Sequence, residues 1–423
     1  MGKSSEFTTV ADFDGNGPSG WRATCMGEVC ELLMGNSPPG STYNESGDGL
    51  PLINGPAEYG PLHPKAVKWT TAPSRICRAN DVLICVRGNT TGRLNVADRE
   101  YCIGRGVAAI RGSDGTAATG FLYFRLLLEA KRILGIAAGG GSTFPNINKP
   151  QLRALPLLLP PLPEQQAIAR VLRTVQRAKE ATEKVIAAAR TLKQSLMRHL
   201  FTYGPVPFDQ ADQVELKETD IGEMPNHWQL HRFDDLFESR LGKMLSQASK
   251  TGKSPRPYVR NANVQWGRLD LTELYDMDFD ESERDKFRLQ HGDVLICEGG
   301  EVGRTAIWRG EIEECYYQKA IHRARPRDGR MSPEFLMYHM MNAFLLRRSY
   351  GIVGTETTIA HLPGVKLKAL PMPMPPRKEQ DEIVQRLSMA DVKETAEECK
   401  KETLDVLFNS LLHNLMTGKV RLS

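Results

Sequence analysis

Two kinds of hydrophobic pattern alternate along the chain, and they predict globular segments followed by long helices. Residues 81–85, Asp-Val-Leu-Ile-Cys, form a continuous apolar run after a turn, which is typical of a buried strand. The surrounding segments are rich in Gly and Pro and contain short β-like runs such as residues 106–110. Residues 120–134 and 333–348 instead have apolar side chains at helical spacing. We therefore expect mixed α/β (α+β) domains of roughly 140–150 residues each.

A different pattern follows residues 155–161, Leu-Pro-Leu-Leu-Leu-Pro-Pro, which must be extended because residues before proline avoid the helical region. From Glu164 to about Phe201 there is neither Gly nor Pro, and apolar residues recur three and four positions apart. Residues 379–415 repeat this pattern. Each segment predicts one helix of ~55 Å, at ~1.5 Å per residue. Helices this long rarely stand alone, so we expect them to pair as a coiled coil; the alternative is that each packs on its own globule.

The side chains expected to line this helix pair are apolar and share helical spacing. They are Ile168, Leu172, Val175, Val185, Leu192 and Leu196 in the first helix, and Ile383, Leu387, Leu404, Leu407 and Leu411 in the second. Residues 391–401 form a polar middle in the second helix. This polar middle either weakens the pairing or marks a face for a partner.

The chain is an internal repeat, because four segments recur in the same order in both halves. The spacing between the copies drifts only slightly, as loop insertions in a duplicated unit would produce. The matched pairs are 18–21 with 225–228, 51–55 with 257–261, 80–85 with 292–297, and 154–165 with 369–380. The patterns together predict a first domain at 1–160, a first long helix at 161–203, a second domain at 204–375, and a second long helix with a C-terminal tail at 376–423.

Composition and charge narrow the class of protein. The chain has 423 residues, of which 40% are hydrophobic, and no run approaches the ~20 apolar residues of a membrane span. The polar first twenty residues do not resemble a signal peptide, so we expect a cytoplasmic protein. Residues 1–202 carry 24 Lys and Arg against 16 Asp and Glu, whereas the remainder carries 31 against 35. The cysteines form no C-x-x-C pair, and no metal site is expected.

The motifs that an enzyme acting on DNA or nucleotides needs are missing from the sequence. Gly252-Lys253-Ser254 suggests a phosphate-binding loop, but Gln247 stands where its first glycine should be, so an exposed basic loop is expected. No G-x-G-x-x-G opens a helix, and the acidic residues 270–285 lack the glycine and glutamate of a calcium loop, so they are interpreted as a solvated acidic loop. These features favour a binding protein without catalytic residues. A standalone nuclease or methyltransferase with an unrecognised site, or a structural adaptor, remain the alternatives.

The order and duplication of the motifs resemble one family. The Leu-Pro-x-x-x-Pro-Pro-x-x-Glu-Gln boundary, the long helix after it, the Pro-x-x-Trp segments and the ending at residues 415–420 are similar to the specificity (S) subunit of type I restriction–modification systems. The resemblance implies two target recognition domains, here called heads, that each read one half of a split double-stranded DNA site. It also implies that the two helices pack antiparallel, related by a pseudo-two-fold axis, and set the spacing.

The same resemblance implies that the chemistry belongs to partners. Two modification (methyltransferase) subunits would dock on the chain and bring S-adenosylmethionine. Restriction subunits would add ATP- and Mg²⁺-dependent cleavage. The chain itself would bind no cofactor.

Candidate DNA contacts are the polar and basic residues of loops, because Arg reads guanine, Asn reads adenine, and hydroxyls and cations contact phosphates. Any one of these loops could instead be an ordinary polar turn. In the first head the candidates are Arg87, Asn89, Thr90, Thr91, Arg93, Ser142 and Thr143. In the second head they are Lys250, Lys253, Arg256, Arg260, Asn261, Asn263, Arg304, Thr355, Thr357 and Thr358.

Overall fold

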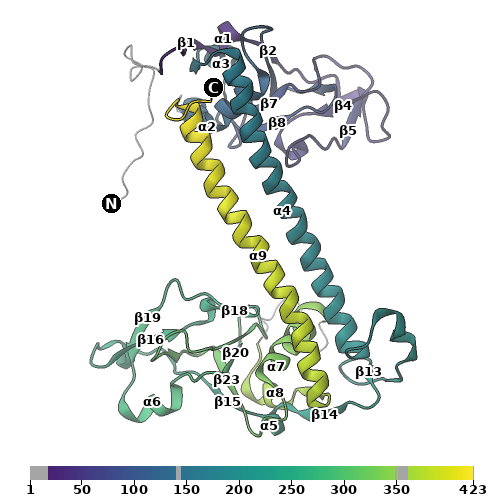
Figure 1. Ribbon diagram of the computed structural model, residues 1–423, viewed down its shortest axis with the longest axis vertical. Helices are drawn as coiled ribbons and strands as arrows, with labels where there is room; N and C mark the ends of the chain where they lie inside the picture. The colour runs from purple at the N-terminus through teal and green to yellow at the C-terminus, as the bar shows by residue number, and fades with distance from the viewer. Residues whose placement is uncertain (1–17, 140–143, 348–349, 351–360, 423) are drawn as a thin grey trace. The chain divides into compact units, whose positions relative to one another are not determined.

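The computed structural model describes residues 18–139, 144–347, 350 and 361–422. It divides into two compact units, with Met1–Glu183 and Cys399–Ser423 in unit 1 and Lys184–Glu398 in unit 2. Each unit holds a globular head and adjoining stretches of two long helices, α4 (Leu162–Tyr203) and α9 (Arg377–Met416), which lie side by side (Figure 1). The two predicted long helices are thus confirmed, and the division between units falls within both of them.

The head of unit 1 is mixed α/β, as expected. Its elements are β1 (Arg22–Cys25), α1 (Met26–Val29), β2 (Cys30–Met34), β3 (Tyr43–Asn44), β4 (Leu50–Ile53), β5 (Lys68–Thr70), β6 (Ile76–Cys77), β7 (Val82–Cys85), β8 (Leu94–Val96), β9 (Tyr101–Ile103), β10 (Val107–Gly112), α2 (Thr119–Ala138), α3 (Lys149–Arg153) and β11 (Pro156–Leu159). One sheet has the order β2-β10-β7-β8 and a second has the order β3-β5-β4-β9-β6. Strands β1 and β11 form a separate antiparallel pair.

Strand β7 shows why the apolar run is continuous. Successive side chains of a strand point to opposite faces of its sheet. Val82 and Ile84 accordingly join the core beneath α2, whereas Leu83 and Cys85 join the core between the two sheets. Both faces of β7 are buried, so every position must be apolar.

The head of unit 2 repeats this architecture with its own insertions. Its elements are β12 (Leu216–Lys217), β13 (Met224–Pro225), β14 (Gln229–Arg232), α5 (Phe233–Leu236), β15 (Phe237–Leu241), β16 (Pro255–Val259), β17 (Val264–Gln265), β18 (Arg268–Leu269), β19 (Tyr275–Asp278), α6 (Glu281–Phe287), β20 (Val294–Cys297), β21 (Thr305–Ile307), β22 (Tyr316–Tyr317), β23 (Ile321–Pro326), α7 (Pro333–Met340), the π-helix η7 (Met341–Arg347), α8 (Gly364–Ala369) and β24 (Pro371–Met374).

The strand orders confirm the repeat inferred from the sequence. The order β15-β23-β20-β21 in unit 2 corresponds to β2-β10-β7-β8 in unit 1, and the pair β14–β24 corresponds to β1–β11. Each head also contains one parallel pair at the same place, β4–β9 in unit 1 and β16–β22 in unit 2. In β20 the alternation of β7 recurs, because Val294 and Ile296 face one core and Leu295 and Cys297 face another.

The recurring Glu-Gln pair at the start of each long helix has a structural role. Buried Gln165 accepts a hydrogen bond from the Ala118 N–H (2.8 Å) and donates to the carbonyls of Thr116 (3.0 Å) and Pro160 (2.8 Å). Gln380 accepts from the Ser332 N–H and donates to the Arg330 and Pro375 carbonyls. In both units, a glutamine near the start of the long helix therefore satisfies three backbone groups with its side-chain amide.

The preceding glutamate explains the recurring tryptophan. The indole N–H of Trp21 donates to the buried Glu164 carboxylate, which also accepts two hydrogen bonds from Arg421 near the chain end. In unit 2 the Trp228 indole donates to Glu379, 2.8 Å away. Arg421 and Trp21 lower the pKa of Glu164 through these hydrogen bonds, so its carboxylate remains charged at neutral pH.

Within each unit the two long helices contact both each other and the head. In unit 1, buried Ile168 and Leu172 share a core with Phe408 and Leu412. In unit 2, Met197 and Leu200 share a core with Ile383 and Leu387. Of the other predicted seam residues, Val175, Leu196, Leu404 and Leu411 are half-buried. Both sequence-based expectations thus apply, helix pairing and packing on the head.

Three predicted seam residues do not line the helix pair. Val185, Leu192 and Leu407 are 40%, 64% and 43% exposed. Their positions along the interface are taken by neighbours, because a straight helix with 3.6 residues per turn drifts away from a stripe of fixed heptads. Ile186 is buried next to Val185, and half-buried Lys193 lies next to Leu192.

The polar middle of α9 pairs with basic residues of α4. In unit 2, Arg190 contacts Glu394 and Glu398, and Lys193 contacts Asp391. In unit 1, Lys179 contacts Asp405 and Lys401 lies 3.6 Å from Glu183. In each unit the numbers rise along one helix as they fall along the other, so the helices run antiparallel, as the resemblance implies. Ion pairs between partly exposed side chains therefore contribute to the helix interface here, beside buried Ile186.

The acidic stretch 270–285 is not the solvated loop expected from its composition. It includes strand β19 and helix α6. Asp280 caps α6 by accepting a hydrogen bond from the Glu283 N–H, and Asp278 is buried. Acidic side chains are common at helix N-termini because they satisfy free N–H groups there, and several of these residues therefore have local structural roles.

No helix in the ranges that the structure covers combines the length and apolar character of a membrane span. Across the same ranges, no group of three or more His, Cys, Asp or Glu side chains is arranged to hold a metal ion.

Candidate nucleic-acid interface

In the first head, the loop between β7 and β8 presents the candidates Arg87, Asn89, Thr90 and Arg93 to solvent. Gly88 and Gly92 have φ values of 78° and 91°, which let the chain reverse without strain. The loop is closed by a 2.9 Å hydrogen bond from the Gly92 N–H to the Cys85 carbonyl. A fixed backbone therefore holds exposed polar side chains.

Thr91 differs from its neighbours in this loop. It is buried and donates its hydroxyl to the Gly88 carbonyl at 2.7 Å, so it shapes the loop. Among the residues that the structure describes, neither Arg87 nor Arg93 forms an ion pair, and both guanidinium groups remain available for phosphate or base contacts. Ser142 and Thr143 lie outside the described residues.

The equivalent loop of the second head is held differently. Arg304 donates to the Asn261 carbonyl at 2.6 Å and lies 3.4 Å from Glu301, and its side chain is only 14% exposed. Asn261 in turn donates from its amide to the Gly299 carbonyl, 2.7 Å away. Arg304 and Asn261 therefore join the loop after β20 to the turn after β16, and the structure gives them a supporting position.

The remaining described candidates of the second head are also partnered. Asn263 is buried, accepts a hydrogen bond from the Arg260 N–H, and donates to the carbonyls of Asp270 and Glu273. Arg256 forms an ion pair with Glu314, and Arg260 pairs with Glu273 while stacking over the Tyr275 ring. DNA contact by these side chains stays a prediction, since the acidic partners would have to be displaced or shared.

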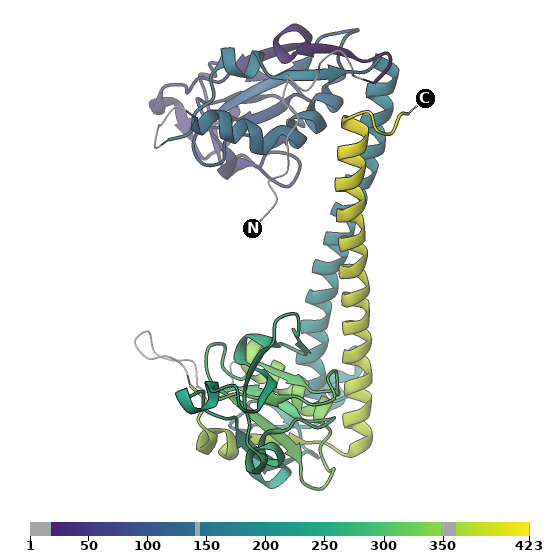
Figure 2. The same cartoon turned by 90° about the vertical axis from the view of Figure 1, so that its left-hand side faces the viewer.

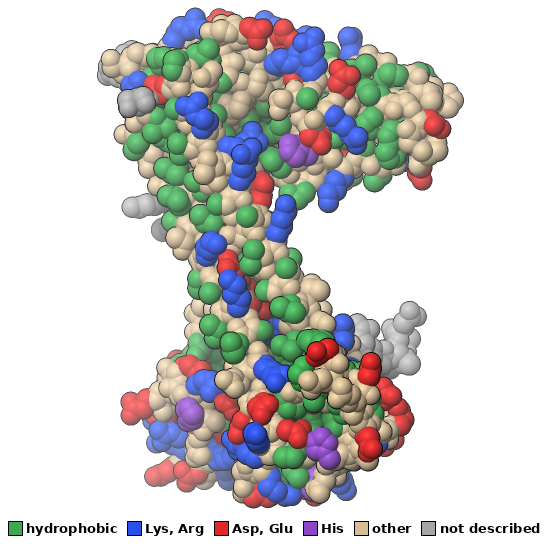
Figure 3. Space-filling model, turned by 45° about the vertical axis from the view of Figure 1, so that its right-hand side comes forward, with side chains coloured by type: hydrophobic (Ala, Val, Ile, Leu, Met, Phe, Trp, Pro, Cys, Tyr) green, Lys and Arg blue, Asp and Glu red, His purple; other side chains and the backbone are tan. Residues whose placement is uncertain are grey.

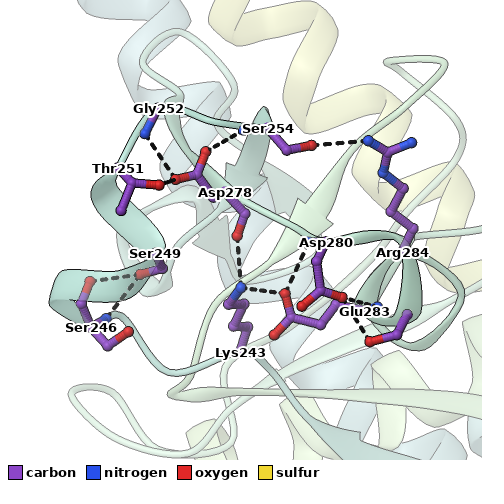
Figure 4. Close-up of polar contacts among 11 residues, drawn as sticks. Lys243, Ser246, Ser249, Thr251, Gly252, Ser254, Asp278, Asp280, Glu283 and Arg284 are labelled. Carbon is purple, nitrogen blue, oxygen red and sulfur yellow. Dashed lines mark hydrogen bonds and ion pairs between the residues drawn. The ribbon is translucent and has the colours of Figure 1, made fainter.

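Lys253 is the most accessible described candidate of the second head, on an exposed loop that precedes β16. Figure 4 shows that this loop folds around the carboxylate of Asp278, at the end of β19. The side chain of Lys250 and residues Thr355, Thr357 and Thr358 lie outside the described part of the structure.

Sequence reasoning missed two residues that shape loops at corresponding places. In the first head, Asn44 accepts hydrogen bonds from the N–H groups of Gly47 (3.1 Å) and Asp48 (3.0 Å) ahead of β4. In the second head, Asp278 has this role ahead of β16. The Asn44 turn has a local signal, since asparagine favours such turns near glycine. Asp278 had none, because the amides that it binds lie more than twenty residues away, as the Ser254 N–H does at a separation of 24.

The two halves of the sequence differ in net charge. Residues 1–202 have an excess of Lys and Arg over Asp and Glu, and the remainder has a small excess of Asp and Glu. On the face drawn in Figure 3, side chains of both signs are intermixed on each unit. A modest excess of basic residues attracts DNA phosphates, whereas a protein that binds DNA irrespective of its sequence is typically far more basic.

Comparison with known proteins gives this arrangement a family. The model of the type I restriction modification DNA specificity domain matches the chain twice, at residues 18–189 and 225–405. The chain therefore belongs to the type I restriction–modification specificity family, and the two matches correspond to the two repeats.

Relatives and solved structures agree with this assignment. The putative type I restriction enzyme MjaX specificity subunit of Methanocaldococcus jannaschii is 34% identical over 187 residues, which cover 44% of this chain and 43% of that protein. The type I restriction enzyme MjaVIII specificity subunit of the same organism is 21% identical over 411 residues, or 96% and 94% of the two chains. The S subunit of a type I system from M. genitalium has the same fold, with a TM-score of 0.62, 16% identity, and 94% and 96% coverage.

Proposed function

We propose that this chain reads a bipartite DNA target, with one half-site contacted by each head. The observation that supports this most strongly is the repeat itself. Two heads share strand order and framework motifs, whereas the loops that connect β7 to β8 and β20 to β21 differ in sequence and in partners. Similar frameworks with unlike loops suit the reading of two unlike half-sites.

The long helices would set the spacing between the two half-sites and dock the modification subunits. Several apolar side chains on α4 and α9 are exposed, and apolar surface of this kind is visible on the helices in Figure 3. The exposed set comprises Val185, Leu192, Met389, Val392, Val406 and Leu407. Exposed apolar residues along a helix pair are suited to burial against a partner.

Catalysis would belong to the partners of this chain. We propose that two modification subunits bind S-adenosylmethionine and that restriction subunits use ATP and Mg²⁺. In the described parts of the two heads, buried Gln165, Gln380 and Glu164 and half-buried Glu379 hold backbone or indole groups of the framework. The chain would then act as the reading component of a larger complex.

Exchange of one head tests the proposed function. If residues 1–160 are replaced by the corresponding head of another specificity subunit, we expect only one half of the methylated site to change. The second half should stay as it was, because its loops belong to the other unit. The measurement is the methylation pattern of a host that carries the chimera and its modification subunits. A change in both halves, or in neither, would refute the two-head reading.

The loop between β7 and β8 supplies a second prediction. Replacing both Arg87 and Arg93 with alanine should weaken DNA binding and lower the slope of log K against log salt by up to about 2, since each lost phosphate contact contributes ~0.9. The measurement is a salt titration of the complex with modification subunits. Arg99→Ala is the control, because this exposed arginine stacks over the Tyr101 ring outside the loop. An unchanged slope in the double variant would remove the loop from the interface.

A further inference from the structure

In the second head, buried Asp278 at the end of β19 holds an exposed loop that contains Lys253 and precedes β16. One carboxylate oxygen accepts the Thr251 hydroxyl at 2.7 Å and the Gly252 N–H at 2.8 Å. The other accepts the Ser254 N–H at 2.7 Å. Figure 4 shows the bonds from Thr251, Gly252 and Ser254 meeting at the Asp278 carboxylate, so the loop wraps around a single acidic group.

The anchor is itself held firmly. The Lys243 ammonium donates to the Asp278 carbonyl at 2.7 Å and forms an ion pair with Glu283. The Phe279 N–H donates to the Ser254 carbonyl at 3.1 Å, and Arg284 donates to the Ser254 hydroxyl at 2.9 Å. Asp278 also pairs with Pro255 in the ladder of β16 and β19. Both the carboxylate and the backbone beside it are therefore fixed to the sheet of the head.

The loop thus has a defined shape, which its hydrogen bonds to Asp278 hold. Gly252, between Thr251 and Lys253, adopts a φ of 75°, in the left-handed region that glycine occupies without strain. Lys253 is exposed, and an added Cβ at Gly252 would meet nothing within 4 Å. The Thr251 hydroxyl and the Ser254 N–H lower the pKa of Asp278, so its charge is retained at neutral pH.

We propose that Asp278 is a positioning residue for DNA reading, and that it holds Lys253 and the N-terminal approach to β16 in the shape that meets the DNA backbone. This inference rests on the proposed function, because it names the loop that the second head would use. Asp278 does not touch DNA in this proposal. Its negative charge by itself repels the DNA phosphates. The charge favours DNA binding only because it holds the loop in shape.

Whether DNA affinity rises or falls in one variant distinguishes a positioning role of Asp278 from a purely electrostatic effect of its charge. Asp278→Asn removes a negative charge, which by electrostatics alone should tighten DNA binding. It also places an amide NH₂ against donors of Thr251, Gly252 or Ser254, so the loop loses bonds whichever way the amide is turned. Positioning therefore predicts weaker binding, by roughly five- to tenfold, with a salt slope reduced by up to about 1.

A matched control is available on the same strand. Asp276 lies two residues before Asp278 and is exposed, and among the described residues its side chain makes no hydrogen bond or ion pair. Asp276→Asn removes the same charge without touching the loop. Its DNA affinity should equal or exceed that of the wild type.

The experiment uses the complex with its modification subunits and duplex DNA that carries the methylated target. Affinity is measured over a range of salt for the wild type, Asp278→Asn, Asp276→Asn, Lys253→Ala and the Asp278→Asn/Lys253→Ala double variant. Because Asp278 acts through the loop, the double variant should bind no more weakly than the weaker single variant. Hydrogen exchange of residues 251–254 should increase in Asp278→Asn without DNA.

The outcomes distinguish this inference from the function on which it rests. If the wild-type complex shows no preference for its target, the proposed function fails and the inference with it. If the wild type is selective but Asp278→Asn binds as tightly as Asp276→Asn, the positioning role alone is overturned. Fully additive losses in the double variant would likewise overturn it, because they would separate Asp278 from Lys253.

Discussion

Replacing Gln380 with alanine should lower the free energy of unfolding by about 3 kcal/mol or more, because the substitution leaves buried backbone groups unpaired at ~1–3 kcal/mol each. The side chain is fully buried and bonds Ser332, Arg330 and Pro375 at 3.0, 2.8 and 3.1 Å. Alanine cannot replace either the acceptor or the donors. At a urea dependence of ~1–3 kcal/mol per molar, the midpoint of unfolding should fall by about 1 M or more.

The control for this variant is Gln385→Ala in the same helix. Gln385 is exposed, and its substitution should change stability by no more than about 0.5 kcal/mol. Circular dichroism during urea denaturation measures both variants. Equal midpoints for Gln380→Ala and the wild type would show that the hydrogen bonds of the glutamine are replaced by water.

This glutamine marks the limit of what the sequence could predict. The recurrence of Glu-Gln at residues 164–165 and 379–380 revealed a repeated element at the start of each helix. Its role was hidden, because the Ser332 N–H that Gln380 bonds lies 48 residues away in the chain. Helices and buried strands can be identified from the sequence, because their periods of 3.6 and 2 residues appear as the spacing of apolar residues along the chain. Contacts across the fold leave no such period.

The residues that line the helix pair were likewise only partly predictable from the sequence. The apolar stripe identified Ile168, Leu172, Ile383 and Leu387 correctly as buried positions, all near the heads. Between them ion pairs enter the interface, and apolar residues such as buried Ile186 alternate with charged ones. Spacing alone could not show that Lys193 would face Asp391, because that choice depends on how the partner helix is aligned.

Candidate DNA contacts were predictable as loops but not as individual side chains. Residue type singled out arginines equally in both heads. The structure separates them, since Arg87 and Arg93 are free of ion pairs among the described residues while Arg256 and Arg260 have acidic neighbours. Those neighbours, Glu314 at a separation of 58 residues and Glu273 at 13, come from other elements. Availability of a charge is therefore a property of the fold.

Proline in place of Ala188 should disrupt α4 and lower stability by about 3 kcal/mol or more. Residue 188 lies in the interior of the helix and is exposed, so the substitution leaves side-chain packing intact. Proline removes the N–H that donates to the carbonyl four residues earlier, and its ring collides with that carbonyl. The ion pairs of Arg190 and Lys193 with α9 lie within the next turns and should weaken with it.

Ala188→Gly provides the matched control, since glycine keeps the N–H and costs only about 1 kcal/mol. Urea denaturation and ellipticity at the helical band measure both variants, and the DNA affinity of the complex adds the functional consequence. If α4 sets the spacing between half-sites, Ala188→Pro should weaken binding to the complete bipartite target far more than Ala188→Gly does. Binding to an isolated half-site should change little, because each head keeps its own loops. Equal losses on both DNAs would mean that α4 supports the heads without setting their spacing.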